Sequence, residues 1–364
     1  MASVSGRLRT QDRHREPGTL VKKGQVLNGY EVVTRPTNAD AGKCLWAFAR
    51  KGSEEFFIKE YLDPKRPRPD SMGSIADKKR RHAECRRFEL RQRQVSTTLR
   101  SDHPKAGNLV LTRDFFVDGT RYYKVTERIA VADIHPQELD PARQLVLIRT
   151  LAESLSLLHE KGIVHGDLKP ENVLLHQPEG SRLFIAKLID FDDAYPAGDP
   201  PPPGVVAGNP LYGAPEWLQY VRSDPGVPPS GLTGAVDVFA FALVVHTYLI
   251  GSLPEYGPRH ESPAAAVLAG DPLRWDHALD DDWHQILGAM TDVIPAARPD
   301  VSIATEAIGF LLGEDRDRFS PSRPAPAPRR SRVRINLTGR AAVRTRGRLR
   351  INLGSSPMPD ERTR

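Results

Sequence analysis

The chain has 364 residues, 39% hydrophobic and 27% charged, which is typical of a soluble globular protein. The formal net charge is +6, but residues 313–364 contain fourteen arginines and five acidic residues, a net of +9, which leaves the rest of the chain near −3. The most apolar run, Val236–Ile250, is too short to span a bilayer and contains Asp237 and His246, so we expect no membrane partner.

The two cysteines indicate neither a zinc site nor a disulfide framework, which favours a reducing compartment. The first sixteen residues are polar and charged, without the apolar core of a secretory signal. We therefore expect a cytoplasmic protein. Residues 1–24 have no hydrophobic period, and we predict that they form a disordered tail.

Residues 25–127 have the pattern of short strands around one basic helix. Length and β-branched or aromatic content predict five strands, at Tyr30–Thr34, Leu45–Arg50, Glu55–Tyr61, Val110–Phe116 and Arg121–Thr126. The last two are joined by a turn at Asp118-Gly119. Ile75–Leu99 lacks Pro and Gly, so we predict a long helix there.

From residue 133 onward the pattern becomes mainly helical. Ala142–Lys161 is an amphipathic helix followed by Gly162 in the position of a helix stop. A compact loop and two short strands follow, over 164–175 and 183–190. Further helices are predicted at Val236–Ile250 and near 262–270, 280–292 and 300–312.

The loop His165–Asn172, read HGDLKPEN, brings together the residue types that phosphoryl transfer requires. Such a reaction needs a carboxylate near the attacking hydroxyl, a cation over the phosphates and an oxygen ligand for Mg²⁺. Asp167, Lys169 and Asn172 supply these in one short loop. Eighteen residues after Asn172, an apolar strand ends in Asp190, whose carboxylate suits a hard cation.

These two segments resemble the catalytic loop H-R-D-x-K-x-x-N and the D-F-G of the eukaryotic-like (bacterial) serine/threonine protein kinase family. The resemblance implies an α+β, bilobal protein-kinase-like fold within residues 25–312. It has a small β-rich lobe, 25–127, with one long helix, and a larger mainly α-helical lobe, 133–312. It also implies ATP and Mg²⁺ as cofactors, with Asn172 and Asp190 as metal ligands.

Other segments match the family in the same order. Gly208–Glu216 is similar to the substrate-docking end of the activation segment. Asp237 matches the buried aspartate that anchors the catalytic loop, and Arg298 the late arginine that pairs with Glu216. A lone Asp or Arg would be an ordinary cap or surface charge, but their order favours the kinase interpretation.

In the small lobe, Phe56–Lys59 resembles V-A-I-K, which implies that Lys59 holds the α- and β-phosphates of ATP. Its partner should be a glutamate of the long helix, either Glu84 or Glu89. Five residues on a helix are about 140° apart, so both cannot face the nucleotide. Glu84 lies nearer the apolar positions Phe88, Val95 and Leu99, and we predict the Lys59–Glu84 pair.

The hinge and the glycine-rich loop are less well marked. Residues 122–127 resemble the strand that leads into the hinge, so Thr126 would be the gatekeeper, with the backbone of Glu127 and Ile129 meeting adenine. The loop Thr37–Cys44 offers only Gly42 where the family usually has three glycines. Glycines allow backbone amides to approach phosphates, so this departure favours a pseudokinase.

The activation segment also departs from the family. Gly166 replaces the arginine that binds an activation-segment phosphate in many relatives, and residues 190–216 contain no serine or threonine. Only Tyr195 and Tyr212 remain as acceptors on this segment. We therefore expect activity without Ser/Thr phosphorylation there. Asn209, where relatives often have threonine, is expected to hydrogen-bond Asp167 or Lys169.

Three functions are compatible with the sequence: an ATP-dependent Ser/Thr protein kinase, a pseudokinase scaffold, and a kinase-like phosphotransferase for small molecules. Lys169 favours Ser/Thr substrates, while Gly208–Glu216 and Arg298 speak against the third function. The sequence does not identify the protein substrate. In the tail, 313–364, RVRINL at 332–337 recurs as RLRINL at 348–353, which suits nucleic acid or a docking partner, although a disordered, solvated tail is favoured.

Overall fold

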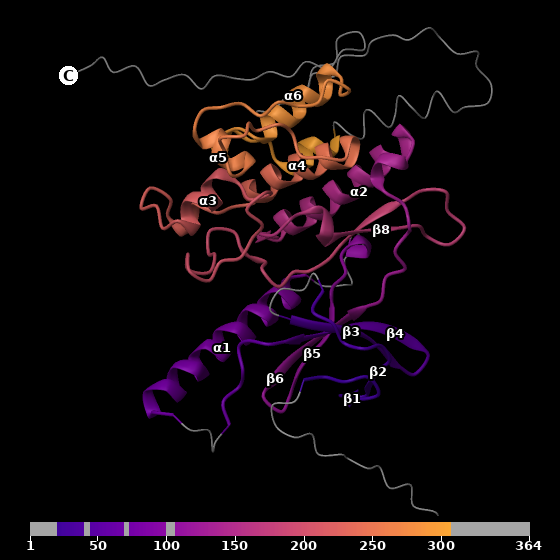
Figure 1. The fold of residues 1–364 in the computed structure, drawn as a ribbon, viewed down its shortest axis with the longest axis vertical. Helices are drawn as coiled ribbons and strands as arrows, with labels where there is room; N and C mark the ends of the chain where they lie inside the picture. Colours follow the sequence, from indigo (N-terminus) through magenta and orange to yellow (C-terminus); the bar gives the residue numbers. More distant parts are fainter. Residues whose placement is uncertain (1–19, 40–43, 69–72, 100–105, 307–364) are drawn as a thin grey trace, which may run out of the picture. The chain divides into compact units, whose positions relative to one another are not determined.

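The computed structural model describes residues 20–39, 44–68, 73–99 and 106–306 (Figure 1). The chain divides into two compact units, residues 1–93 with 112–128, and residues 94–111 with 129–364. In this division residues 94–111 belong to the second unit, whereas the predicted small lobe ran without a break over 25–127. The domain ends at 25 and 312 stay predictions, and most of the two predicted tails lies outside the described residues.

The first unit contains an antiparallel sheet of six strands in its described part. The strand order across the sheet is β1-β2-β3-β4-β6-β5. One of these strands, the two-residue β1, was not predicted from the sequence. The bounds are β1 Val26–Leu27, β2 Tyr30–Val32, β3 Cys44–Lys51, β4 Glu54–Tyr61, β5 Thr112–Asp118 and β6 Arg121–Glu127. The predicted turn between β5 and β6 is confirmed, with Gly119 at φ 61°.

Helix α1, Ile75–Thr98, packs on one face of this sheet. The ring of Phe88 lies 5.0 Å from that of Tyr61 on β4 and 5.1 Å from that of Tyr122 on β6. Because side chains alternate along a strand, Lys59 lies on the same face of β4 as Tyr61. The opposite face is covered by a separate apolar cluster that includes Ile58 and Tyr123.

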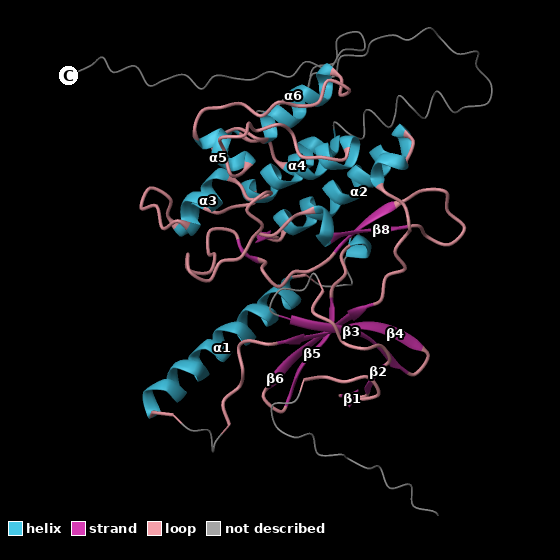
Figure 2. Ribbon diagram, viewed as in Figure 1, coloured by secondary structure: helices cyan, strands magenta, loops and turns pink. Residues whose placement is uncertain are grey.

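The second unit is mainly helical, as Figure 2 shows. Its helices are α2 Pro141–Glu160, α3 Pro215–Val221, α4 Ala235–Ile250, α5 Pro263–Leu268 and α6 Asp281–Met290. Two short antiparallel strand pairs accompany them, β7 Ile163–Val164 with β10 Tyr195–Pro196, and β8 Val173–His176 with β9 Ile185–Leu188. Residues 301–306 are also helical, and the rest of the helix predicted over 300–312 lies outside the described residues.

Local sequence explains the ends of α2. The side chain of Asp140 accepts a hydrogen bond from the backbone N–H of Arg143 at the N-terminus, and Pro141 occupies the first turn. The helix stops before Gly162, which adopts φ 66°, a conformation that glycine reaches without steric cost. The predicted helix and its stop are therefore confirmed.

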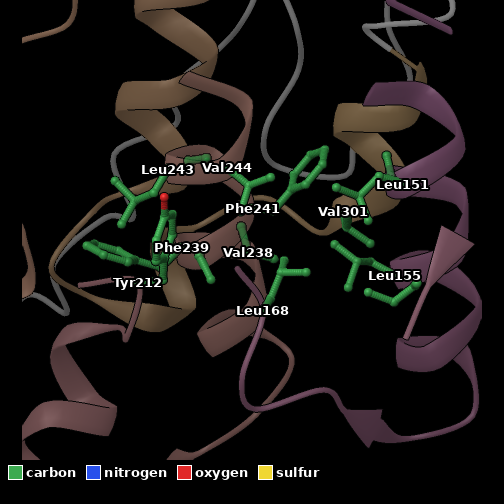
Figure 3. Packing of buried hydrophobic residues seen from close by; sticks show 14 of the residues in the cluster. Leu151, Leu155, Leu168, Tyr212, Val238, Phe239, Phe241, Leu243, Val244 and Val301 are labelled. Carbon is green, nitrogen blue, oxygen red and sulfur yellow. The ribbon is translucent and has the colours of Figure 1, made fainter. Parts of the chain in front are cut away.

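The core of the second unit lies around α4, in which 12 of the 16 residues are buried. Figure 3 shows Phe239 and Phe241 of this helix among Leu151 and Leu155 of α2 and Leu168 of the catalytic loop. Each such side chain contributes about 1.5–3 kcal/mol when fully buried. The most apolar run of the sequence is thus a core helix, and no helix within the described ranges is long and apolar enough to cross a bilayer.

Candidate active site

Three residues of the loop 165–172 meet at the carboxylate of Asp167. The Nζ of Lys169 lies 2.7 Å from Asp167 Oδ2, and Nδ2 of Asn172 donates to the same oxygen at 3.0 Å. Asn172 also donates to the backbone carbonyl of Asp167 at 2.7 Å. The other oxygen, Oδ1, has no hydrogen-bond partner within the part of the chain that the structure describes. One carboxylate oxygen is therefore held by two side chains of the loop, and the other is not.

Asp237 holds the backbone of this loop from the core. Its carboxylate accepts the N–H of His165 at 2.7 Å and of Gly166 at 3.0 Å, and Nε2 of His159 donates to it at 3.0 Å. Burial by itself would raise the pKa of Asp237, but the hydrogen bond and charge of His159 together with the N–H of Gly166 hold it below its ordinary value. The anchoring role expected for Asp237 is confirmed.

The two expected metal ligands lie at adjacent ends of the β8–β9 pair. The N–H of Ile189 donates to the carbonyl of Asn172 at 2.9 Å, and Asp190 follows immediately. Asp190 adopts φ 62°, an uncommon conformation that aspartate tolerates better than most residues. Because Asn172 uses its Nδ2 on Asp167, its amide oxygen remains for a cation. Two oxygen ligands completed by phosphate oxygens are the usual protein contribution to a Mg²⁺ site, so the residues fit this ion.

His165 links the catalytic loop to the segment that carries Asp190. Its Nε2 lies 3.0 Å from the carbonyl of Ile189, so this nitrogen carries the proton and donates. Its ring also meets that of Phe191 edge-on, with centroids 5.4 Å apart. No cluster of three or more His, Cys, Asp or Glu side chains forms a self-contained metal site in the described ranges.

The structure does not bring Glu84 to Lys59. Glu84 is exposed on α1 and has no ion pair among the described residues, whereas Glu89 is half-buried and accepts a hydrogen bond from the Tyr122 hydroxyl at 2.7 Å. The helical wheel placed Glu84 near the apolar stripe of α1, but the side chain is exposed.

A buried amide was missed by the sequence analysis. Gln92 is 4% exposed, one turn beyond Phe88 on the face of α1 that packs against the sheet. Lys59 lies on that sheet face, two residues before Tyr61. The position of Gln92 between Phe88 and Val95 on the apolar stripe was the signal that could have identified this buried amide.

Three more residues were predicted to contact the nucleotide: Gly42, Glu127 and Ile129. Gly42 lies outside the described residues. Glu127 ends β6, and its side chain is 3.5 Å from that of Arg113. Ile129 follows in the second unit and is half-buried. The roles of Glu127 and Ile129 toward adenine stay predictions.

The pair predicted between Glu216 and Arg298 is confirmed. Two guanidinium nitrogens of Arg298 donate to the two carboxylate oxygens of Glu216, at 2.7 and 2.8 Å, and both side chains are buried. The prediction for Asn209 is wrong, since its amide oxygen accepts the N–H of Leu211 at 2.8 Å instead of reaching Asp167 or Lys169. A local turn satisfies this side chain.

The model of the protein kinase domain matches residues 75–307, more than half of the chain. Among similar proteins, the serine/threonine-protein kinase pkn2 of Myxococcus xanthus is 30% identical over 207 residues, 54% of this chain and 23% of the relative. The serine/threonine-protein kinase PkaB of Streptomyces coelicolor is 30% identical over 234 residues, 58% of this chain and 50% of the relative. The chain thus matches half or less of the length of these relatives.

The chain belongs to the protein kinase family, because the family model matches more than half of it. The sheet-rich unit, the helical unit and the catalytic loop agree with this assignment. The predicted fold class is therefore confirmed.

Proposed function

We propose that the chain is an ATP-dependent protein kinase that transfers the γ-phosphoryl group to serine or threonine hydroxyls of proteins. The observation that carries this proposal is the asymmetric carboxylate of Asp167, with Oδ2 bound to Lys169 and Asn172 and Oδ1 without a partner among the described residues. Relatives named serine/threonine-protein kinases support the substrate class.

Each residue has a role in this reaction. Oδ1 of Asp167 accepts the proton of the substrate hydroxyl, while Lys169 places positive charge beside the transferred group. Asn172 and Asp190 would hold Mg²⁺, and Lys59 would bind the α- and β-phosphates. When bound, ATP would supply the phosphoryl group, and Mg²⁺ would neutralise the negative charge that develops on it.

The activation segment supports activity without a Ser/Thr phosphate because local contacts already hold it. The N–H of Gly198 donates to the carbonyl of Leu232 at 2.9 Å, and the hydroxyl of Tyr220 donates to the carbonyl of Pro201 at 3.0 Å. The indole N–H of Trp217 donates to the carbonyl of Ala207 at 3.0 Å. We infer that these bonds replace the ordering effect of a phosphate.

The test is phosphoryl transfer from labelled ATP with Mg²⁺ by the wild-type chain and by Asp167→Ala and Lys59→Met. Loss of a general base typically lowers the rate by about 10²–10⁴-fold, so Asp167→Ala should be nearly inactive. Glu179→Ala, an exposed carboxylate in the loop between β8 and β9, is the matched control and should keep full activity.

Equal labelling in the wild type, Asp167→Ala and Lys59→Met would refute the kinase proposal. Phosphoamino-acid analysis of the product distinguishes Ser/Thr from Tyr acceptors. Phosphatase treatment should leave the wild-type rate unchanged, and loss of activity together with a phosphate mapped to residues 190–216 would contradict the account of the activation segment.

A further inference from the structure

Gly166, immediately before Asp167, lies against an aromatic ring. It adopts φ 79°, a conformation that residues with a Cβ rarely reach. A Cβ at this position would be 2.8 Å from Cε1 and 3.3 Å from Cδ1 of Tyr195, and 3.0 Å from the carbonyl oxygen of Asp193. The absence of a side chain at Gly166 is therefore what allows the ring to lie on this backbone.

Tyr195 is fixed in place by its own strand. It belongs to β10 and pairs with Val164 of β7, two residues before Gly166. The residue is fully buried, and its hydroxyl has no hydrogen-bond partner in the part of the chain that is described. Burial, followed by the charges of Asp237 and Glu216, raises the pKa of Tyr195 above its ordinary value. A buried, neutral hydroxyl without a hydrogen-bond partner contributes little to stability. The ring is therefore the part of Tyr195 that holds the loop.

Gly166 is thus held by two different groups. Its N–H donates to Oδ1 of Asp237 at 3.0 Å, and the ring of Tyr195 occupies the space where a Cβ would point. Polar and apolar contacts fix the same peptide, one bond from the residue that carries the catalytic carboxylate. In relatives with arginine at this position, that side chain reaches a phosphate instead.

We propose that Tyr195 is a positioning residue for the catalytic loop, and that its ring on Gly166 replaces the arginine and activation-segment phosphate of other family members. This inference rests on the proposed kinase function. It also changes the expectation for Tyr195, since a fully buried side chain in this packing is no phosphate acceptor.

The experiment is a double-mutant cycle on kcat and KM for ATP with Gly166→Ala, Tyr195→Ala and the double variant. In Gly166→Ala the new methyl group collides with the ring, so kcat should fall while KM for ATP stays constant. Removing the ring frees that space, so Gly166→Ala should lower kcat less in the Tyr195→Ala background than in the wild type. For residues in contact, the effects of two substitutions on kcat typically deviate from independence by about threefold or more. Tyr195→Phe should retain wild-type kcat, because only the unpartnered hydroxyl is lost.

Tyr248 of α4 provides the matched control. It is also buried with an unpartnered hydroxyl among the described residues, but it is not among the nearest neighbours of Gly166. Tyr248→Ala should lower stability and combine additively with Gly166→Ala. All rates are compared at a temperature at which circular dichroism shows every variant folded.

The outcomes separate this inference from the proposed function. An active wild type with additive Gly166→Ala and Tyr195→Ala effects, or an inactive Tyr195→Phe, would overturn the inference alone. A wild type that transfers no phosphate would overturn the kinase proposal. Hydrogen exchange then tests the packing of Tyr195 on the loop without an activity assay. Amides 163–168 should exchange faster in Tyr195→Ala but not in Tyr195→Phe or Tyr248→Ala. Unchanged exchange in Tyr195→Ala would refute the positioning role.

Discussion

His246 on α4 is a buried imidazole whose two nitrogens have different partners. Nδ1 lies 2.7 Å from the carbonyl of Ser252, to which it donates, and Nε2 accepts the N–H of Asp276 at 3.2 Å. This pattern requires the neutral ring with its proton on Nδ1. Burial, opposed by the hydrogen bond to Ser252, lowers the pKa of His246 below its ordinary value.

The lowered pKa of His246 predicts a stability change on mild acidification. The unfolded chain takes up the proton first, so the stabilisation from neutral His246 is complete above pH 6.5 and declines as the pH falls toward the folded-state pKa. His246→Gln should lower the free energy of unfolding at pH 7.5, by about 1–3 kcal/mol, and flatten its decline between pH 7.5 and 5.5. Urea unfolding at several pH values measures both effects.

His277 is the control for that series, because its side chain is fully exposed. His277→Gln should leave the pH dependence as it is in the wild type. If His246→Gln keeps the wild-type slope between pH 7.5 and 5.5, another group is responsible and the assignment to His246 is wrong.

At the scale of elements, Arg298 joins α3 and α4 to the segment after α6. Besides Glu216 of α3, it donates to the carbonyl of Asp292 and to that of Ala235 at the start of α4, both at 2.8 Å. Its guanidinium also lies 5.1 Å from the ring centroid of Phe239. The buried cation thus makes four hydrogen bonds to three elements, and it ties Glu216, at the end of the docking segment 208–216, to the start of α4.

Removing Arg298 should therefore destabilise the second unit strongly. Arg298→Ala leaves Glu216 buried without its partner, for which a cost of about 3–5 kcal/mol is typical. Arg298→Lys keeps the charge but not the bidentate geometry. Its free energy of unfolding should therefore lie between those of the wild type and Arg298→Ala. Chemical unfolding gives the values.

The exposed pair Arg222–Glu261 is the matched comparison, since both side chains are more than half exposed. Arg222→Ala should change stability by about 1 kcal/mol or less, because solvent screens such pairs. If Arg222→Ala and Arg298→Ala lowered the free energy of unfolding equally, burial would not be the reason for the contribution of the Glu216–Arg298 pair to stability.

How well an element could be predicted from the sequence depended on its length and on the regularity of its pattern of apolar and polar residues. The strands β3, β4 and β6 and the helices α1, α2 and α4 follow from runs of seven or more residues with a clear pattern. Helix α3 was missed because seven residues after a proline-rich segment show no reliable period. Family motifs located Asp167, Asp190 and Arg298, since their order along the chain is informative.

Contacts between distant residues were beyond the sequence. Gly166 and Tyr195 are 29 positions apart, and no periodicity relates a missing side chain to the ring that fills its place. Similarly, Glu84 is well placed on a helical wheel, but a wheel does not say which turn of α1 meets which strand. Packing in three dimensions, rather than local propensity, decides both cases.

For the whole molecule, charge is divided sharply along the chain. Residues 129–306 contain ten basic and twenty-five acidic residues, a net of −15, whereas residues 1–128 carry a net of +12 and the tail 313–364 a net of +9. Binding to a phosphate-rich polymer through counterion release depends on such local positive charge rather than on the overall value of +6. Removing the tail alone reverses the sign of the net charge, from +6 to −3.

We propose that the tail gives the chain a charge-driven, sequence-independent affinity for polyanions. Deleting residues 313–364 changes the net charge from +6 to −3 and should weaken retention on a DNA or heparin column, while the unfolding midpoint of the remaining chain stays constant. Retention of the full chain should fall steeply between 50 and 200 mM salt, as expected for about six to ten phosphate contacts.

The repeats RVRINL and RLRINL provide the internal control for that affinity. Replacing Arg332, Arg334, Arg348 and Arg350 by lysine preserves the charge and should preserve retention, whereas replacement by glutamine should weaken it. Loss of retention in the lysine variant would show that the repeats are recognised as a motif, because lysine cannot reproduce the planar, bidentate contacts of arginine. Equal retention of the truncated and full chains would instead assign the affinity to the basic residues of the first unit.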